Sequence, residues 1–227
     1  MKKRYWAFLI GSWCLSVGMQ AAKVDTLSVH SDAMNKEVQV ITICPDKAMA
    51  GEKCPVLYLL HGYGGNAGTW LGIKPELPQI ADKEGIIFVC PDGKNSWYWD
   101  SPLNKEYRYE TFVSKELVNY IDKNFTTKVE RGGRAITGLS MGGHGSLWLS
   151  IRHKDVFGGG GSMSGGLDIR PFPNNWEMKK QLGEEASNKQ RWDEHTVINQ
   201  LDKIKNGDLA VIIAVSYTHL RAHETGR

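Results

Sequence analysis

One serine of this sequence lies in a pattern that is typical of catalytic nucleophiles. Ser140 is the central residue of the pentapeptide GLSMG at positions 138–142, which fits G-x-S-x-G. An apolar segment precedes it and a segment with helical periodicity follows, so we expect a tight turn from a strand into a helix. Small residues two positions before and after let the chain segments pass closely, and the turn holds the hydroxyl above the sheet. An ordinary serine in a glycine-flanked turn is the alternative, and the context favours a nucleophile that attacks a carbonyl carbon.

Attack on a carbonyl creates a negatively charged oxygen, which needs nearby N–H donors. The N–H of Met141, at the start of the expected helix, is one candidate. The segment HGYGG at 61–65 directly follows another apolar segment, and there we expect the N–H of Tyr63 first and that of Gly64 second to donate. His61 is expected to hold this loop and not to act as a base, while a plain glycine turn is the alternative. The glycine spacing does not match G-x-G-x-x-G, so a dinucleotide site is disfavoured.

A sheet must position these segments, because apolar strand-like runs alternate with helical patterns along the chain. Such alternation predicts an α/β fold with a mostly parallel central sheet flanked by helices. The expected strands are 37–44, 56–60, 86–90, 134–139, 157–163 and 209–214, the last as a buried strand. The expected helices are 77–83, 109–125 and 142–152. The polar stretch 176–204 is expected to form helices above or beside the sheet, either as a substrate mouth or as plain surface helices.

Five segments that occur in order along the chain resemble one known family. They are HGYGG (61–65), PDG (91–93), SWY (96–98), GLSMGG (138–143) and GSMSG (161–165). Together they resemble the esterase D-like family of the α/β-hydrolase superfamily, which includes S-formylglutathione hydrolases, tributyrin esterases, feruloyl and acetyl-xylan esterases, and mycolyltransferases. The resemblance covers 38–214. It implies an α/β-hydrolase fold, C-terminally truncated here, and a serine carboxylic-ester hydrolase with no metal or organic cofactor.

The resemblance implies the same roles for the serine and for the N–H groups, and it adds a candidate substrate site. Trp97, Tyr98 and Asp100 fall on a loop that often lines the acyl or alcohol site in relatives. A packed aromatic loop without substrate contact is the alternative for these residues.

The two other residues of a catalytic triad have no candidates in this chain. In α/β-hydrolases the acid follows the serine along the chain, and the histidine follows the acid. The acid would come just after the strand 209–214 and the histidine after one further strand, so both are expected beyond Ala214. The histidines after the serine do not replace them; they are His144, His153, His195, His219 and His223. Without a base a serine hydroxyl is a weak nucleophile, so the chain as written is expected to be nearly inactive.

Both ends of the chain are expected to lie outside the folded domain. Residues 1–22 combine a basic start, an apolar run and a small-residue cleavage site, which predict a cleavable signal peptide. The protein would then be secreted or periplasmic with no stable membrane anchor after cleavage, and an amphipathic first helix or a membrane anchor is the alternative. The segment at 215–225 resembles a translated sequencing adapter, so 215–227 is expected to be an artefactual tail and not a genuine polar one. The α/β-hydrolase domain is then 23–214 and incomplete.

Composition limits the remaining classes of function. The 227 residues are 41% hydrophobic and 23% charged, which excludes a disordered chain. A net charge of +3 is too small to indicate a nucleic-acid partner. Cys44 and Cys54 either pair as a disulfide or stay free, and Cys90 is expected to be a small buried residue.

The sequence therefore predicts an exported serine carboxylesterase that hydrolyses acyl esters through an acyl-enzyme on Ser140. The expected substrates are small-molecule or polysaccharide esters, with carbohydrate-linked acetyl or feruloyl groups as the leading candidates. The alternatives are a thioesterase like S-formylglutathione hydrolase, an acyltransferase like the mycolyltransferases, and a non-catalytic carbohydrate-binding relative. Acyl and alcohol specificity and the oligomeric state are not predicted.

Overall fold

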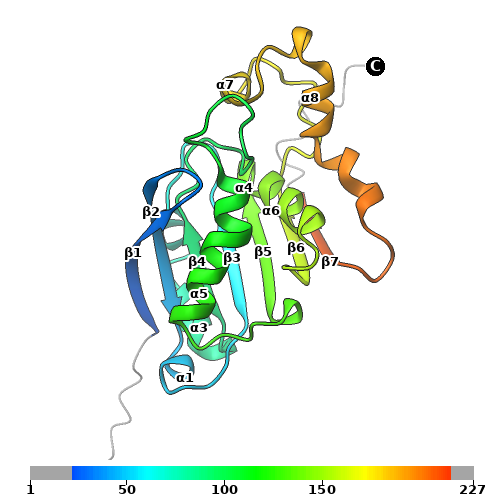
Figure 1. Cartoon of the computed structure of the whole chain (residues 1–227). Helices are drawn as coiled ribbons and strands as arrows, with labels where there is room; N and C mark the ends of the chain where they lie inside the picture. Colours follow the sequence, from blue (N-terminus) through cyan, green and yellow to red (C-terminus); the bar gives the residue numbers. More distant parts are fainter. Residues whose placement is uncertain (1–21, 216–227) are drawn as a thin grey trace, which may run out of the picture.

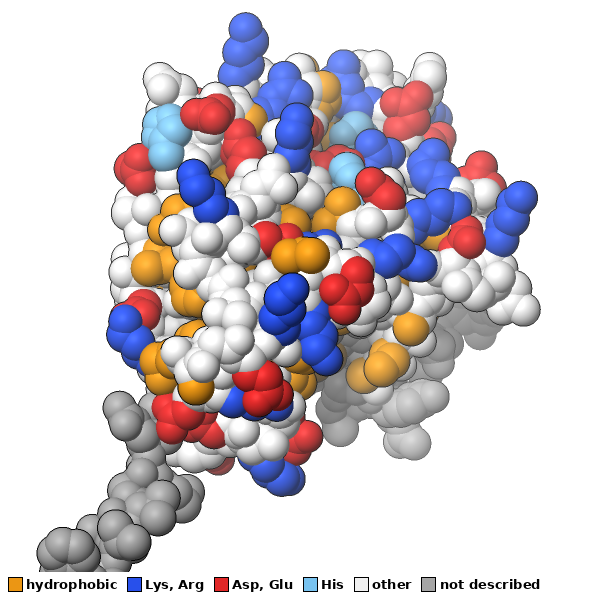
Figure 2. Space-filling model, turned by 60° about the horizontal axis from the view of Figure 1, so that its bottom comes forward, with side chains coloured by type: hydrophobic (Ala, Val, Ile, Leu, Met, Phe, Trp, Pro, Cys, Tyr) orange, Lys and Arg blue, Asp and Glu red, His pale blue; other side chains and the backbone are white. Residues whose placement is uncertain are grey.

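The computed structural model describes residues 22–215 (Figure 1). The expected signal peptide, apart from Ala22, and nearly all of the expected tail lie outside these residues. Within them, no helix is long and apolar enough to cross a membrane. Figure 2 shows Lys and Arg side chains interspersed with Asp and Glu over one face of the molecule, in keeping with the small net charge.

The centre of the fold is a seven-stranded sheet with the order β1-β2-β4-β3-β5-β6-β7. Its strands are β1 (Lys23–Ser31), β2 (Lys36–Cys44), β3 (Val56–Leu60), β4 (Ile87–Pro91), β5 (Arg134–Leu139), β6 (Gly159–Met163) and β7 (Ala210–Ala214). The pairs β1–β2 and β2–β4 are antiparallel, and the other four pairs are parallel. The predicted α/β fold with a mostly parallel sheet is confirmed. Because parallel strands end at the same edge, the loops after β3, β4, β5 and β6 meet there.

Helices cover both faces of this sheet. One continuous helical segment consists of α4 (Tyr109–Thr111), the π-helical turn η1 (Phe112–Leu117) and α5 (Val118–Asn124), and α6 (Met141–Arg152) packs on the same face. The opposite face carries α2 (Thr69–Ile73) and α3 (Leu77–Glu84). The predicted helices at 77–83, 109–125 and 142–152 are therefore confirmed to within about a residue at each end. The remaining short elements before β5 are α1 (Asp46–Met49) and the 3-10 turn η2 (Arg131–Gly133).

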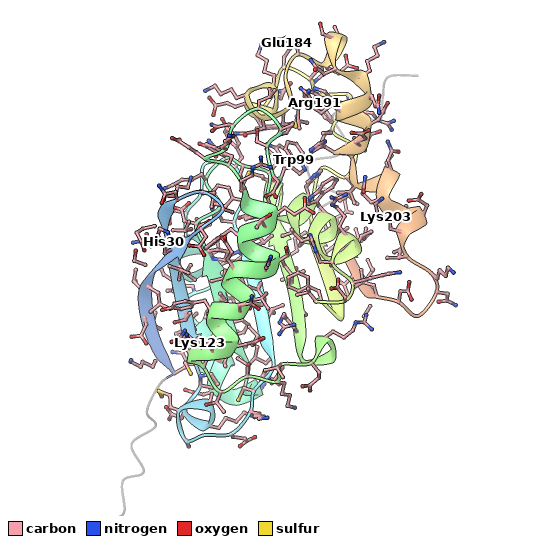
Figure 3. All side chains as sticks on the ribbon, viewed as in Figure 1. His30, Trp99, Lys123, Glu184, Arg191 and Lys203 are labelled. Carbon is pink, nitrogen blue, oxygen red and sulfur yellow. The ribbon has the colours of Figure 1, made fainter. Side chains whose placement is uncertain are left out.

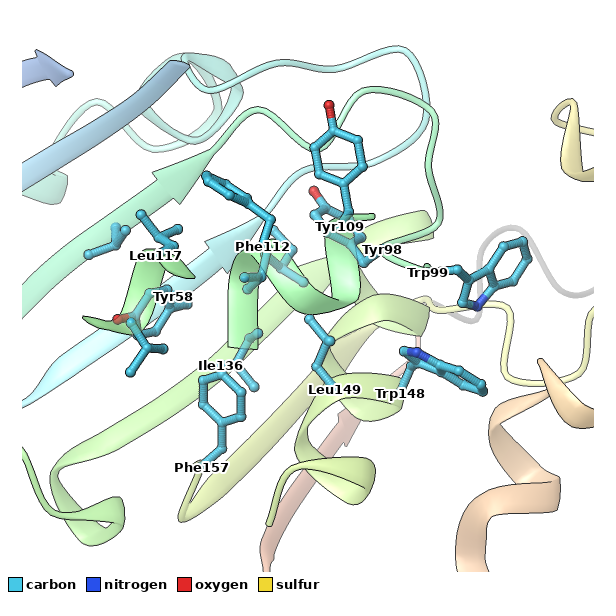
Figure 4. Close-up of a cluster of buried hydrophobic side chains, with 14 of the residues drawn as sticks. Tyr58, Tyr98, Trp99, Tyr109, Phe112, Leu117, Ile136, Trp148, Leu149 and Phe157 are labelled. Atoms are coloured by element: carbon cyan, nitrogen blue, oxygen red, sulfur yellow. The ribbon is translucent and has the colours of Figure 1, made fainter. Parts of the chain in front are cut away.

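The core follows the alternation of side chains along the strands. Tyr58 and Leu60 of β3 belong to the cluster under α4, α5 and α6, whereas Leu59 between them belongs to the cluster under α2 and α3. The first cluster holds most of the buried aromatic side chains of the fold (Figure 4). It positions the start of α6 firmly, because Met141 is itself buried within it.

The polar stretch after β6 forms short helices, as expected. They are α7 (Met178–Leu182), the 3-10 turn η3 (Glu185–Ser187), α8 (Lys189–Glu194) and the 3-10 turn η4 (Val197–Lys203). Figure 1 shows α7 and α8 beyond the carboxyl ends of the parallel strands, and η4 packs beside α6. The segment therefore lies both above and beside the sheet.

Two strands of the fold differ from the sequence-based expectation or extend it. The strand at 209–214 exists as β7, but its side chains are exposed and the prediction of a buried strand is wrong. It pairs on one side only with β6, whose Gly159, Gly160 and Gly161 lie opposite it and offer no side chains to pack against it. The strand β1 was not predicted, because its inward-facing positions include Asp25 and Ser31 and its hydrophobic pattern is broken.

The described cysteines are Cys44, Cys54 and Cys90, and all three are buried free thiols. The expected burial of Cys90 is confirmed, and Cys44 and Cys54 are not joined in this structure.

Candidate active site

Ser140 occupies the tight turn between β5 and α6 that its pattern predicts. Its backbone has φ 55° and ψ −115°, a conformation that residues with a side chain rarely adopt. The Ser140 N–H donates to the carbonyl oxygen of Met163 at 2.8 Å, and the Ser140 carbonyl accepts from the His144 N–H at 3.0 Å. The serine is exposed at the carboxyl edge of the sheet, so its hydroxyl is accessible to a substrate.

Gly142, two residues after the serine, is required by close packing at this turn. A Cβ placed on Gly142 would lie 2.2 Å from the carbonyl oxygen of Leu60, at the end of β3. The start of α6 can therefore approach β3 only through glycine. This contact also brings the loop after β3 towards the serine, because a Cβ on Gly62 would lie 3.5 Å from the Cβ of Ser140.

The candidate oxyanion donors differ in availability. The N–H of Met141 belongs to the first residue of α6, where no carbonyl of the same helix is within reach. The N–H of Tyr63 has no acceptor among residues 22–215, whereas the N–H of Gly64 already donates to Oδ1 of Asn95 at 2.9 Å. Met141 and Tyr63 therefore present the N–H groups that a new oxyanion can use, and the oxyanion role itself stays a prediction.

His61 is buried and both of its ring nitrogens are engaged within the loop. Nε2 accepts from the N–H of Gly93 at 2.8 Å, which assigns the ring proton to Nδ1, and Nδ1 donates to the carbonyl oxygen of Gly62 at 2.7 Å. The ring thus ties the loop after β3 to the loop after β4. This geometry agrees with the expected structural role and leaves no nitrogen free to act as a base.

The candidate substrate residues on the loop after β4 lie mostly in the interior. Tyr98 is fully buried, and its hydroxyl donates to the carbonyl oxygen of His61 at 3.2 Å. Asp100 accepts from the N–H of Thr111 at 3.0 Å and from its hydroxyl at 2.5 Å, so it anchors the start of the helical segment 109–124. Trp97 is also buried, but its indole N–H reaches outward to the carbonyl oxygen of Trp176 at 3.3 Å. Substrate contact by these residues stays a prediction, and the packed-loop alternative describes their present environment.

The histidines after Ser140 that the structure describes are all held elsewhere. His144 is buried beneath Trp99, whose indole N–H donates to Nε2 at 3.0 Å, and burial lowers the pKa of His144 to about 4. The ring of His153 contacts Glu110 at 2.9 Å, and His195 stacks on Trp148. Among residues 22–215 no side chain hydrogen-bonds to the Ser140 hydroxyl; His219 and His223 lie outside this range.

Two residues of the site were not identified from the sequence. Partial desolvation first, and then the carboxylate of Glu177, raise the pKa of Tyr63. Asn95 holds the Gly64 N–H, as described above. Neither residue belongs to a recognisable sequence pattern, because each is brought to the site by the folding of a separate loop. In the described part of the chain, no group of three His, Cys, Asp or Glu side chains is placed to hold a metal ion.

The sheet order, the serine turn and the converging loops together define an α/β-hydrolase fold with an exposed serine at the turn after β5. The family model described as "Putative esterase" matches residues 31–220, and the chain belongs to this family of serine hydrolases.

Curated relatives include esterases and an acyltransferase. An acetyl esterase of Caldicellulosiruptor saccharolyticus is 29% identical over 63% of this chain and 56% of that protein. An endo-1,4-beta-xylanase/feruloyl esterase of Xylanibacter ruminicola is 34% identical over 51% of this chain and 17% of that protein. The diacylglycerol acyltransferase/mycolyltransferase Ag85A of Mycobacterium leprae is 34% identical over 64% of this chain and 44% of that protein. The chain thus spans about half the length, or less, of the curated relatives it matches.

Solved structures share the fold. An S-formylglutathione hydrolase from Agrobacterium tumefaciens superposes with a TM-score of 0.71 at 19% identity, covering 87% of this chain and 88% of the other. A fluorophosphonate-binding serine hydrolase of Staphylococcus aureus gives a TM-score of 0.73 at 19% identity, covering 86% and 80%. At these identities the likeness establishes the α/β-hydrolase fold alone.

Proposed function

We propose that this protein is an exported serine carboxylesterase that cleaves acyl esters, with acetyl or feruloyl groups on carbohydrate as its substrates. The observation that carries the proposal is the exposed Ser140 in a strained turn, next to the unused N–H groups of Met141 and Tyr63. The acetyl esterase and feruloyl esterase relatives support this substrate class. The expected signal peptide supports export.

The geometry is suited to acylation of the serine. The Ser140 hydroxyl attacks the ester carbonyl, and the carbonyl oxygen becomes an oxyanion that the N–H groups of Met141 and Tyr63 stabilise. The alcohol then leaves, the acyl group stays on the serine oxygen, and water attacks it in a second step. If a sugar hydroxyl replaces water in that step, the same site acts as an acyltransferase, which is the second candidate because of the acyltransferase relative.

We propose that the general base and its acid partner come from residues beyond β7. The N–H of Ser164 donates to the carbonyl oxygen of Ala214 at 2.8 Å, and the carbonyl of the preceding Met163 holds the N–H of Ser140. The chain that follows β7 therefore emerges at the same edge as the nucleophile. The chain order of nucleophile, acid and histidine in this fold agrees with that placement. We propose accordingly that the 227-residue chain turns over esters very slowly.

A fluorophosphonate probe tests the nucleophile directly, because the serine oxygen displaces fluoride from phosphorus and stays covalently bound. We expect slow labelling of the 227-residue chain and none of Ser140→Ala. Hydrolysis of p-nitrophenyl acetate should follow the same order. Equal labelling of wild type and Ser140→Ala would refute the assignment of the nucleophile. Transfer of acetyl groups to xylose that outruns hydrolysis would favour the acyltransferase.

A further inference from the structure

The ring of His144 is completely buried where three segments of the chain meet. His144 lies on α6 four residues after Ser140, and its backbone N–H donates to the serine carbonyl. Its Nδ1 lies 2.7 Å from the carbonyl oxygen of Gly166, in the loop after β6. Its Nε2 lies 3.0 Å from the indole nitrogen of Trp99, in the loop after β4. The imidazole therefore bridges two loops from different strands, and it does so from the helix that begins at the serine turn.

The two partners determine where the proton of this ring lies. A carbonyl oxygen only accepts, so Nδ1 of His144 donates to Gly166. An indole N–H only donates, so Nε2 accepts from Trp99. The ring is therefore neutral with its proton on Nδ1, and burial, which lowers its pKa to about 4, favours the same form. Both nitrogens are occupied, so the ring has no free nitrogen to serve as a base.

The loop after β6 also holds the backbone of the serine turn. The carbonyl oxygen of Met163, the last residue of β6, accepts from the Ser140 N–H at 2.8 Å. A Cβ on Gly165 would lie 2.8 Å from the backbone nitrogen of His144, so this loop runs directly against the first turn of α6. Residues 164–166 are Ser, Gly and Gly and offer no apolar side chain to anchor the loop. Hydrogen bonds must therefore hold it in place.

The loop after β4 connects His144 with the candidate oxyanion loop. Trp97 and Tyr98 have φ values of 58° and 61°, a conformation that persists only where the surrounding structure imposes it. The Tyr98 hydroxyl donates to the carbonyl oxygen of His61, the first residue after β3. The next residue, Trp99, donates to His144. The strained loop is thus held at one residue by the oxyanion loop and at the next by α6.

Aromatic rings enclose the imidazole. The rings of Trp97 and Trp99 stack 5.5 Å apart, and each meets the ring of His144 edge-to-face at 5.2 Å. Figure 3 shows Trp99 between the carboxyl edge of the sheet and the segment that bears Glu184 and Arg191. Hydrogen bonds in such a buried, apolar environment are strong, and loss of one partner leaves the other unsatisfied. Removal of the imidazole should therefore disturb both loops.

We propose that His144 is a positioning residue of the Ser140 site: its neutral ring holds the loop after β6 and the loop after β4 in place beside the nucleophile. We call the two hydrogen bonds to Gly166 and Trp99 the histidine clamp. His144 itself touches no substrate and transfers no proton. The inference rests on the proposed esterase for its effect on reactivity, whereas the clamp can be measured without catalysis.

Nitrogen-15 NMR of the 227-residue chain at neutral pH tests the clamp directly. We expect the His144 ring to carry its proton on Nδ1 and the indole proton of Trp99 to exchange slowly with solvent. His144→Leu forms neither hydrogen bond, so deuterium uptake by residues 97–99 and 163–166 should become faster, as mass spectrometry measures. A proton on Nε2, or uptake by both loops that is unchanged in His144→Leu, would refute the clamp.

The rate at which a fluorophosphonate labels Ser140 tests the positioning role. We expect His144→Leu to lower this rate about tenfold or more, because small displacements of a reacting group have effects of that size. His144→Gln supplies a donor and an acceptor and should recover most of the rate. Leu149→Ala is the control, since it removes a buried side chain of α6 that makes no hydrogen bond. It should lower stability in urea and leave the labelling rate and the uptake by both loops unchanged.

A second variant covers the case in which circular dichroism shows His144→Leu to be unfolded. Trp99→Phe keeps a ring and removes only the donor to Nε2. It should slow the labelling of Ser140 about threefold or more, as expected for the loss of one buried hydrogen bond.

The outcomes separate this inference from the proposed function. A folded His144→Leu or Trp99→Phe variant that is labelled at the wild-type rate overturns the positioning role and leaves the esterase standing. The same conclusion follows if Leu149→Ala slows labelling as much as His144→Leu, or if His144→Gln recovers none of the rate. A wild-type chain that shows both hydrogen bonds and their effect on deuterium uptake, but no labelling of Ser140, overturns the esterase alone.

Discussion

A Cβ placed on Gly138 would lie 2.2 Å from the carbonyl oxygen of Gly142. The two glycines of the serine turn therefore touch each other across the point where β5 passes into α6. This contact explains why the residue two before the serine must lack a side chain.

We expect Gly138→Ala to destabilise the protein by about 1–3 kcal/mol, because the added methyl group has no space without a shift of the backbone. Gly72→Ala is the matched control, since a Cβ there meets nothing within 4 Å. That control should be neutral or slightly stabilising, as expected for alanine in place of glycine in a helix. Urea unfolding of the two variants measures the difference, and equal stabilities would contradict the steric explanation of the turn.

The backbone strain at Ser140 leads to a second prediction, which concerns the stability of two variants at this position. Its φ of 55° is accessible to glycine but costly for a residue with a side chain. Ser140→Gly and Ser140→Ala both remove the nucleophile, but the glycine variant should be more stable by about 1 kcal/mol. Thermal unfolding of the pair checks this, with fluorophosphonate labelling absent in both. A glycine variant less stable than the alanine variant would show that the turn is not strained.

The burial of His144 predicts a pH dependence of stability. Burial lowers its pKa to about 4 from an ordinary value of 6.5, so the unfolded chain takes up a proton at a pH where the folded chain does not. The contribution is complete above pH 6.5 and is lost as the pH falls to about 4, for a total of about 3 kcal/mol.

His144→Gln keeps a donor and an acceptor for Gly166 and Trp99 but cannot titrate, so its free energy of unfolding should fall less between pH 7 and pH 4. Denaturant unfolding at several pH values gives the two slopes. Parallel curves for wild type and variant would exclude His144 as a source of acid sensitivity.

The exposure of β7 predicts a contrast between two isoleucines. Ile212 is 75% exposed on β7, whereas Ile136 on β5 is fully buried. Ile136→Ala should cost about 2–5 kcal/mol, while Ile212→Ala should change stability by less than about 0.5 kcal/mol. Chemical denaturation of both variants measures this, and similar losses would mean that β7 is covered in solution.

The order of strands and helices could be predicted from the sequence because hydrophobic periodicity records which side chains a strand or helix buries. The parallel strands and three main helices carry clear patterns, and the predicted strand at 134–139 coincides with β5. Ser140 could be identified for a related reason, since a tight turn with glycines on both sides is a local requirement. The burial of β7 could not be predicted, because burial depends on which neighbours a strand acquires.

The sequence by itself determined the fold class, the tight turn that holds Ser140 and the glycine-rich loop after β3, since each depends on residues that are adjacent along the chain. Only the tertiary structure decided that Gly64 is already engaged, that Tyr98 is interior, and that the indole of Trp97 meets the carbonyl oxygen of Trp176. These relationships join segments about 30 to 80 residues apart, and no local pattern encodes a contact made when separate loops fold onto one edge of a sheet.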